Sequence, residues 1–277
     1  MDYPPVGTSW NLRFATDVLI LSKISEGTFA TVHKAVNRVE GCFYAMKKVH
    51  CDPSGDCQRN RQALTEVQVS ASLGVHDNIV RYFTSFYENE YLYSQYELCS
   101  RNLKAVSLDN KKFTSQKALL NMIYQMAVAL EFIHKRGIIH MAVSPLKIYM
   151  AYPNFKLGGF RYAIRKDKPS DIKTKGLYLK YTAPEILDEN VDYKELDPEL
   201  LETVDIYSLG ATVYELARGF SANFLYSHSF EQLVSAMMNP LPSSRPTAKA
   251  LLKTLREEFQ IYSATPIYYL RKEEGSS

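Results

Sequence analysis

Residues 139–148 read Ile139-His140-Met141-Ala142-Val143-Ser144-Pro145-Leu146-Lys147-Ile148, and residues 156–161 read Lys156-Leu157-Gly158-Gly159-Phe160-Arg161. Three shorter motifs lie before and after them: Ala45-Met46-Lys47, Ala183-Pro184-Glu185 and Asp205-Ile206-Tyr207-Ser208-Leu209-Gly210. Each motif alone is weak, because short motifs recur by chance. Their order along the chain is far more specific, and the fold prediction therefore starts from the whole set.

The chain divides into two parts that differ in predicted secondary structure. Before Tyr96, segments rich in β-branched and aromatic residues are broken by Gly and Asn, which predicts strands over 18–24, 30–36, 42–49, 78–86 and 91–96. Helical spacing predicts one helix among them, over 61–73. After Leu103 helices dominate: one begins at Thr114 or Ser115, and others are expected over 204–217 and 247–259.

This order of elements and motifs resembles the protein kinase fold, from about Val18 to Phe259. The resemblance implies an α+β, bilobal structure: a β-rich N-lobe with one regulatory helix, and a mainly helical C-lobe. Residues 24–32 are similar to the glycine-rich loop, with Gly27 as the one glycine kept of three. The predicted boundaries are a tail at 1–13, a kinase-like domain at 14–260 and a C-terminal extension at 261–277. Within that domain we expect the N-lobe at 14–96, the hinge at 97–102 and the C-lobe at 103–260.

Three stretches are similar to the Wee-type and Myt-type inhibitory cell-cycle kinases: Glu66-Val67, residues 73–83, and the hinge-like Tyr96-Glu97-Leu98-Cys99. Members of that branch phosphorylate Tyr or Thr on cyclin-dependent kinases. Similar hinges also occur in the kinases of the integrated stress response.

Three positions depart from the family's chemistry. The resemblance places Ala142 at the catalytic Asp, Lys147 at the metal-binding Asn and Gly159 at the metal-binding Asp. Glycine has no side chain with which to coordinate Mg²⁺, and an ammonium group stands where a divalent cation belongs. Loss of a positioned base alone costs about 10²–10⁴ in rate. We therefore expect no catalytic residue and no metal site, and predict a pseudokinase that is not an enzyme.

Lys47 and Glu66 are the best case for nucleotide binding, because the resemblance places them at the phosphates. Either the pair simply ties a strand to a helix, or it belongs to a pocket that binds nucleotide weakly and without metal. That pocket would use residues of the glycine-rich loop, the third strand, the helix, the hinge and the C-lobe: Gly27, Val32, Ala45, Lys47, Glu66, Glu97, Cys99 and Met150. A compensating role for Lys147, as a cation facing a phosphate, is a further alternative.

Three charged residues are expected to be architectural. The resemblance pairs Glu185 with Arg245 and places Asp205 on a buried helix. All three residues are expected to make buried, charge-assisted hydrogen bonds. His140 is expected to pack in the bend of the catalytic loop.

Composition sets broad limits. A chain of 277 residues can bury a large core, and its net charge of +3 is too weak to predict a nucleic-acid partner. No apolar run approaches the roughly 20 residues of a membrane span. Residues 1–5 carry no secretion signal, so we expect a nuclear or cytoplasmic, intracellular location. Cys51 and Cys57 flank a Pro-Ser-Gly turn and could bind metal or become oxidised, but no cysteine spacing is typical of a metal site, and free intracellular thiols are the favoured expectation.

The predicted function is that of a protein-interaction scaffold or allosteric regulator, whose partner is a kinase or a kinase substrate. No cofactor is expected, with ATP bound without Mg²⁺ as the alternative. Two other functions stay open. One is a divergent Wee-like kinase with weak phosphotransfer, in which an acidic residue such as Asp167, Asp171, Asp188 or Glu189 is recruited to hold metal. The other is a metal-independent nucleotide-binding switch.

Overall fold

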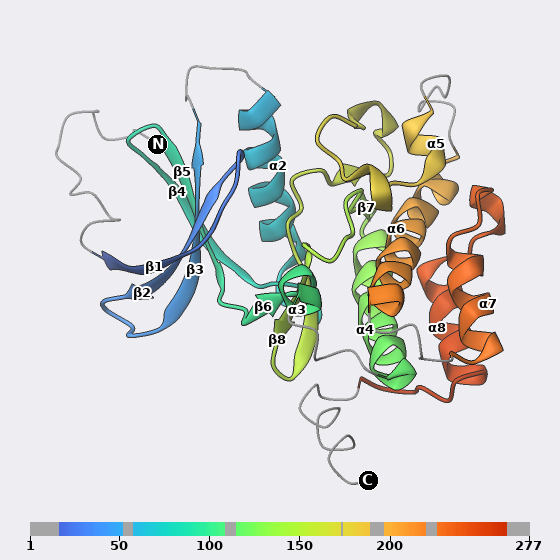
Figure 1. The fold of residues 1–277 in the computed structure, drawn as a ribbon. Coiled ribbons are helices and arrows are strands. Elements are labelled where there is room, and N and C mark those ends of the chain that lie inside the picture. The colour runs from blue at the N-terminus through green and yellow to red at the C-terminus, as the bar shows by residue number, and fades with distance from the viewer. Residues whose placement is uncertain are drawn as a thin grey trace, which may run out of the picture.

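The computed structural model describes residues 17–51, 58–108, 115–172, 174–188, 197–219 and 226–264. They form a strand-rich N-terminal lobe and a helical C-terminal lobe, which lie side by side (Figure 1). The α+β, bilobal prediction is thus confirmed. The predicted tail at 1–13 lies outside the described residues, as does the C-terminal extension beyond 264.

The N-terminal lobe is a five-stranded antiparallel sheet with one helix. Its strands are β1 (Val18–Glu26), β2 (Thr31–Asn37), β3 (Phe43–His50), β4 (Tyr82–Glu88) and β5 (Tyr91–Glu97), in the order β1-β2-β3-β5-β4. Helix α2 (Gln58–Leu73) lies between this sheet and the helical lobe (Figure 1). The central strand β3 carries Lys47, and the buried face of α2 carries Glu66. Both side chains are therefore held by regular elements at the boundary between the lobes.

The helical lobe is built around α4 (Gln116–His134), which is buried along most of its length. Ser115 begins this helix, because its side chain accepts a hydrogen bond from the Ala118 N–H at 3.2 Å. Helices α6 (Pro198–Gly219) and α8 (Ala248–Glu257) pack against α4, and α7 (His228–Met237) packs against α6. The short helices α3 (Leu103–Leu108) and α5 (Pro184–Leu187) complete the lobe.

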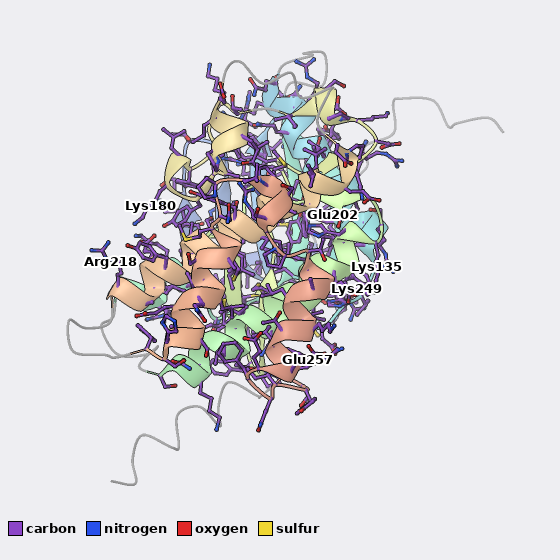
Figure 2. All side chains as sticks on the ribbon, turned by 90° about the vertical axis from the view of Figure 1, so that its right-hand side faces the viewer. Lys135, Lys180, Glu202, Arg218, Lys249 and Glu257 are labelled. Atoms are coloured by element: carbon purple, nitrogen blue, oxygen red, sulfur yellow. The ribbon has the colours of Figure 1, made fainter. Side chains whose placement is uncertain are left out.

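Helix α8 illustrates how sequence periodicity divides core from surface in this lobe. Leu251, Leu252 and Leu255 recur at helical spacing and are buried against α4. Lys249 and Glu257 lie on the outward side of the same helix, where Figure 2 shows them among the charged side chains of this face. The predicted helix over 247–259 is confirmed with slightly shorter bounds.

Short ribbons position the two quoted stretches beneath the N-terminal lobe. Strands β6 (Arg101–Asn102), β8 (Ile148–Ala151) and β9 (Asn154–Leu157) form a small sheet, and β7 (Ile138–Ile139) pairs with β10 (Ile164–Arg165). The Val80 N–H donates to the Leu157 carbonyl at 2.9 Å, which joins the lobes at this point. Residues 139–148 and 156–161 consequently face the cleft between the lobes.

Some elements differ from the expectations. The strand predicted over 78–86 begins only at Tyr82, because Ile79 instead bridges to Leu157 of the other lobe. The helix predicted from residue 204 begins at Pro198, and α7 was not predicted. Within the part of the chain that the structure describes, no helix is both long enough and apolar enough to cross a membrane.

Candidate functional site

The cleft between the lobes contains a buried ion pair. Lys47 Nζ lies 2.5 Å from Glu66 Oε2, and the two side chains are only 15% and 6% exposed. The register of β3 between β2 and β5 places Lys47 opposite Val32 and Ser94. The sequence-predicted partners are therefore brought together from a strand and a helix that are far apart in the chain.

Glu66 faces more positive charge than this one partner supplies. Burial alone would raise the pKa of its carboxyl group, but Lys47, Lys147 and Arg161 together outweigh burial and lower the pKa. Glu66 is therefore ionised at neutral pH, and it is the shared counterion of three cations.

Lys147 fills the space next to Gly159. The Gly158 N–H donates to the Lys147 carbonyl at 3.0 Å, which sets the two quoted stretches beside each other. A Cβ atom added to Gly159 would lie 2.8 Å from Lys147 Cδ and 2.9 Å from Lys147 Nζ. Burial, and then repulsion from Lys47, lower the pKa of the Lys147 ammonium to about 8. Lys147 is therefore still mostly protonated at pH 7.

A magnesium site of the usual kinase type does not fit here. The two positions that would supply oxygen ligands carry a glycine and an ammonium group, and the ammonium fills the space that a carboxylate at Gly159 would need. Among the described residues, no cluster of three or more His, Cys, Asp or Glu side chains is arranged to hold a metal ion.

Arg161 adds a third cation and contacts the glycine-rich loop. Its guanidinium group lies 4.4 Å from the centre of the Phe29 ring and donates to the Tyr162 hydroxyl at 2.9 Å. Arg59 donates to the Phe29 carbonyl at 2.7 Å. The tip of the loop is thereby tied to both walls of the cleft. Phe29 was not among the predicted site residues, because the sequence offers no signal for it beyond its place in the loop.

The bend of the catalytic loop, at residues 140–142, is held by hydrogen bonds although Ala142 stands in place of the catalytic Asp. The His140 N–H and the Met141 N–H each donate to Asp205 at 2.8 Å, and His134 Nε2 lies 2.9 Å from the same carboxylate. Burial lowers the pKa of His140 to about 4, so its ring is neutral. His140 Nδ1 accepts a hydrogen bond from the Ala142 N–H at 3.3 Å, and Nε2 lies 3.2 Å from the Gly158 carbonyl. These contacts give His140 a structural role.

Glu185 and Arg245, which were predicted to be architectural, form a bidentate ion pair. Arg245 donates to the two Glu185 oxygens at 2.6 and 2.8 Å, and its side chain is fully buried. Further bonds run from Arg245 to the carbonyls of Asn239 and Pro240. This pair joins the short helix α5 to the loop before α8 in the helical lobe.

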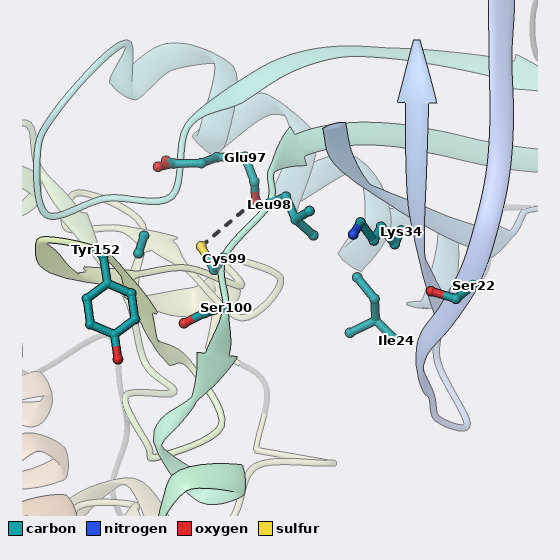
Figure 3. A pocket seen from close by; sticks show the side chains of 9 residues that line it. Ser22, Ile24, Lys34, Glu97, Leu98, Cys99, Ser100 and Tyr152 are labelled. Atoms are coloured by element: carbon teal, nitrogen blue, oxygen red, sulfur yellow. Dashed lines mark hydrogen bonds between the residues drawn. The ribbon is translucent and has the colours of Figure 1, made fainter. Parts of the chain in front are cut away.

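A pocket of about 470 Å³ opens at the hinge (Figure 3). Of the predicted pocket residues, Glu97 and Cys99 line it. Its other lining residues come from β1, β2, the hinge and the end of β8: Ser22, Ile24, Lys34, Leu98, Ser100, Ala151 and Tyr152. The Glu97 carboxylate is already engaged by Lys156 at 2.9 Å, and burial raises the pKa of the Cys99 thiol to about 12.

The remaining predicted pocket residues lie elsewhere. Val32, Ala45 and Met150 do not line the hinge pocket, and Met150 is buried beneath the hinge, where its carbonyl accepts bonds from Ser100. Gly27 donates its N–H to the Ala30 carbonyl at 3.0 Å within the loop. The hinge pocket is therefore lined by none of Lys47, Lys147 and Arg161, and Ile24 of β1 borders it.

Comparisons with known proteins identify the family. A family profile described as a protein kinase domain matches residues 19–226. A Wee1-like protein kinase of Arabidopsis thaliana is 39% identical over 267 residues, which cover 90% of this chain and 51% of that protein. One of Oryza sativa is 37% identical over 87% of the chain, and Wee1-like protein kinase 1-B of Xenopus laevis is 27% identical over 90%. The chain spans about half the length of these relatives.

These comparisons correct one prediction. The replacements at Ala142, Lys147 and Gly159 led us to expect that the chain is not an enzyme. The plant relatives at 39% and 37% identity bear the name protein kinase, and the match extends over most of the chain, so that prediction is wrong. The similarity to Wee-type kinases is confirmed. Fold, motif order and these matches together mean that the chain belongs to the protein kinase family.

Proposed function

We propose that this chain is a divergent Wee1-like protein kinase domain, which binds ATP between its lobes and slowly transfers the γ-phosphoryl group to a protein hydroxyl in the nucleus or cytoplasm. The Lys47–Glu66 ion pair at 2.5 Å carries the proposal, because in kinases this lysine positions the nucleotide phosphates and the glutamate orients the lysine. The resemblance to two plant Wee1-like protein kinases supports the same function.

The transfer is expected to be slow, for a specific reason. Position 142 carries no carboxylate to receive the proton of the attacking hydroxyl, so this proton passes to water as the oxygen attacks the γ-phosphorus and ADP leaves. A missing general base lowers the rate by about 10²–10⁴. Orientation of the reactants and the electrostatic stabilisation by Lys47 remain available.

Radiolabelled phosphotransfer tests the proposal. The chain is incubated with γ-³²P-ATP and a Glu–Tyr copolymer, and labelling of both the chain and the copolymer is followed over time. Lys47→Met is the negative control. A variant that combines Ala142→Asp, Lys147→Asn and Gly159→Asp is the positive control, which we expect to be faster than the natural chain by about 10²–10⁴.

The natural chain is expected to label the acceptor slowly but measurably above Lys47→Met. Labelling no greater than that of Lys47→Met, with the triple variant active, contradicts phosphotransfer. Melting curves of all three proteins verify that each is folded.

A further inference from the structure

The cleft carries unbalanced positive charge at the place where phosphates are held. Lys47, Lys147 and Arg161 all act on the Glu66 carboxylate, and they lower its pKa although burial opposes this. Burial first, and then repulsion from Lys47 and Arg161, lower the pKa of Lys147. A buried surplus of like charge is costly, and an anion bound among these groups would relieve it.

Two of the three cations have donors to spare. Arg161 Nε is buried and has no hydrogen-bond partner among the described residues. The Lys147 ammonium forms no hydrogen bond or ion pair within the described ranges, although Lys47 is engaged by Glu66 at 2.5 Å. Donors shielded from solvent ordinarily have a partner, so the two groups are suited to donate hydrogen bonds to an oxyanion.

The glycine-rich loop offers less than usual to such an anion. The Gly27 N–H is used within the loop, where it donates to the Ala30 carbonyl at 3.0 Å. Glycine normally allows the backbone to approach phosphates closely, but Ser25 and Ala30 carry side chains here. Cationic side chains below the loop would therefore neutralise most of the negative charge of a bound phosphate.

We propose that the cleft binds the triphosphate of a nucleotide as a metal-free anion, with the Lys147 ammonium in the position that a metal ion would take. Lys147 is suited to this role because its chain fills the space beside Gly159, with Nζ 2.9 Å from the Cβ position of that residue. The inference rests on the nucleotide binding that the proposed function includes, but it does not require phosphotransfer. Mg²⁺ neutralises part of the triphosphate charge, so its presence should not strengthen binding.

Calorimetric titration of the full chain tests the inference, with ATP in EDTA and in excess Mg²⁺. ATP is expected to bind in EDTA at least as tightly as in Mg²⁺, and Lys147→Met to weaken the binding in EDTA by about 10-fold or more. Lys135→Met is the matched control, because Lys135 is an exposed lysine of the helical lobe that pairs with Glu131. It should bind ATP like the natural chain.

Tripolyphosphate and adenosine separate the two ends of the nucleotide. Competition by tripolyphosphate, but not adenosine, in EDTA supports the cationic cluster as the site. Binding that requires Mg²⁺, or that Lys147→Met leaves unchanged, overturns the inference while leaving phosphotransfer intact. Absence of ATP binding in both conditions overturns the inference and the proposed function together.

Discussion

Two ionic networks of this molecule differ in how completely their charges are matched. In the helical lobe, Arg245 is fully buried, and its bonds go to both Glu185 oxygens and to backbone carbonyls. In the cleft, Glu66 is shared by Lys47 and two further cations. The first network is complete within the protein. The second sets three cations against one carboxylate.

This difference separates what holds the fold together from what acts on a ligand. Asp205 binds two backbone N–H groups of the catalytic-loop bend, so the bend keeps its shape although Ala142 has replaced its acid. Each guanidinium nitrogen of Arg245 donates a hydrogen bond, whereas Arg161 Nε in the cleft has no hydrogen-bond partner among the described residues. Substitutions in the two networks should therefore have different effects, on stability in one case and on ligand binding in the other.

The largest loss of stability is expected from Asp205→Ala. This change leaves the N–H groups of His140 and Met141 buried without their acceptor and removes the partner of His134. The expected cost is about 3–5 kcal/mol in the free energy of unfolding. Urea denaturation measures it, with Asp167→Asn at an exposed ion pair as the control. Equal stability of the two variants would show that Asp205 does not hold the bend.

A somewhat smaller loss is expected when the second buried pair is broken. Glu185→Gln leaves the Arg245 guanidinium without its carboxylate, which should cost about 3 kcal/mol. Because the damage comes from an uncompensated buried charge, the double variant Glu185→Gln, Arg245→Met should regain part of that loss. A double variant whose loss is the sum of the two single losses would contradict this explanation.

In the cleft, by contrast, removing the charge of Lys147 should increase the stability of the chain. Folding lowers the pKa of Lys147 to about 8, from an ordinary value of 10.5. The unfolded chain therefore binds more protons than the folded chain between pH 8 and 10.5, and the natural chain gains stability as pH rises through that range. Lys147→Met should be more stable than the natural chain at pH 7, by about 1–2 kcal/mol because the side chain is only partly buried.

Melting curves at pH 7, 8, 9 and 10 measure this difference between Lys147→Met and the natural chain. The advantage of the variant should shrink steadily above pH 8. A constant advantage, or a loss of stability at pH 7, would mean that Lys147 is not a strained cation in the ligand-free cleft.

Sequence reasoning succeeded where local patterns determine the structure. Ser115 is a favourable cap before an apolar periodic segment, and α4 begins there. The approach of Lys47 to Glu66 and of Glu185 to Arg245 followed from the order of the motifs. These contacts belong to the fold itself, which the motifs identify.

The rest depended on tertiary contacts that no local pattern records. Nothing in the sequence indicates that Arg161 lies against Phe29 or that Lys147 fills the space beside Gly159. The hinge pocket likewise includes Ile24 and Tyr152, which approach it from separate lobes. Short ribbons such as β8 and β9 have too few residues to show a period.

The most direct test of the account is the melting temperature of the chain against rising ATP, once in EDTA and once with Mg²⁺. A ligand that binds the folded state raises the melting temperature by mass action. If the cleft binds the triphosphate without metal, the rise in EDTA is at least as large as the rise with Mg²⁺, and it is lost in Lys147→Met. No rise in either condition, or a rise that requires Mg²⁺, would contradict the claim that the cleft is completed by a metal-free anion.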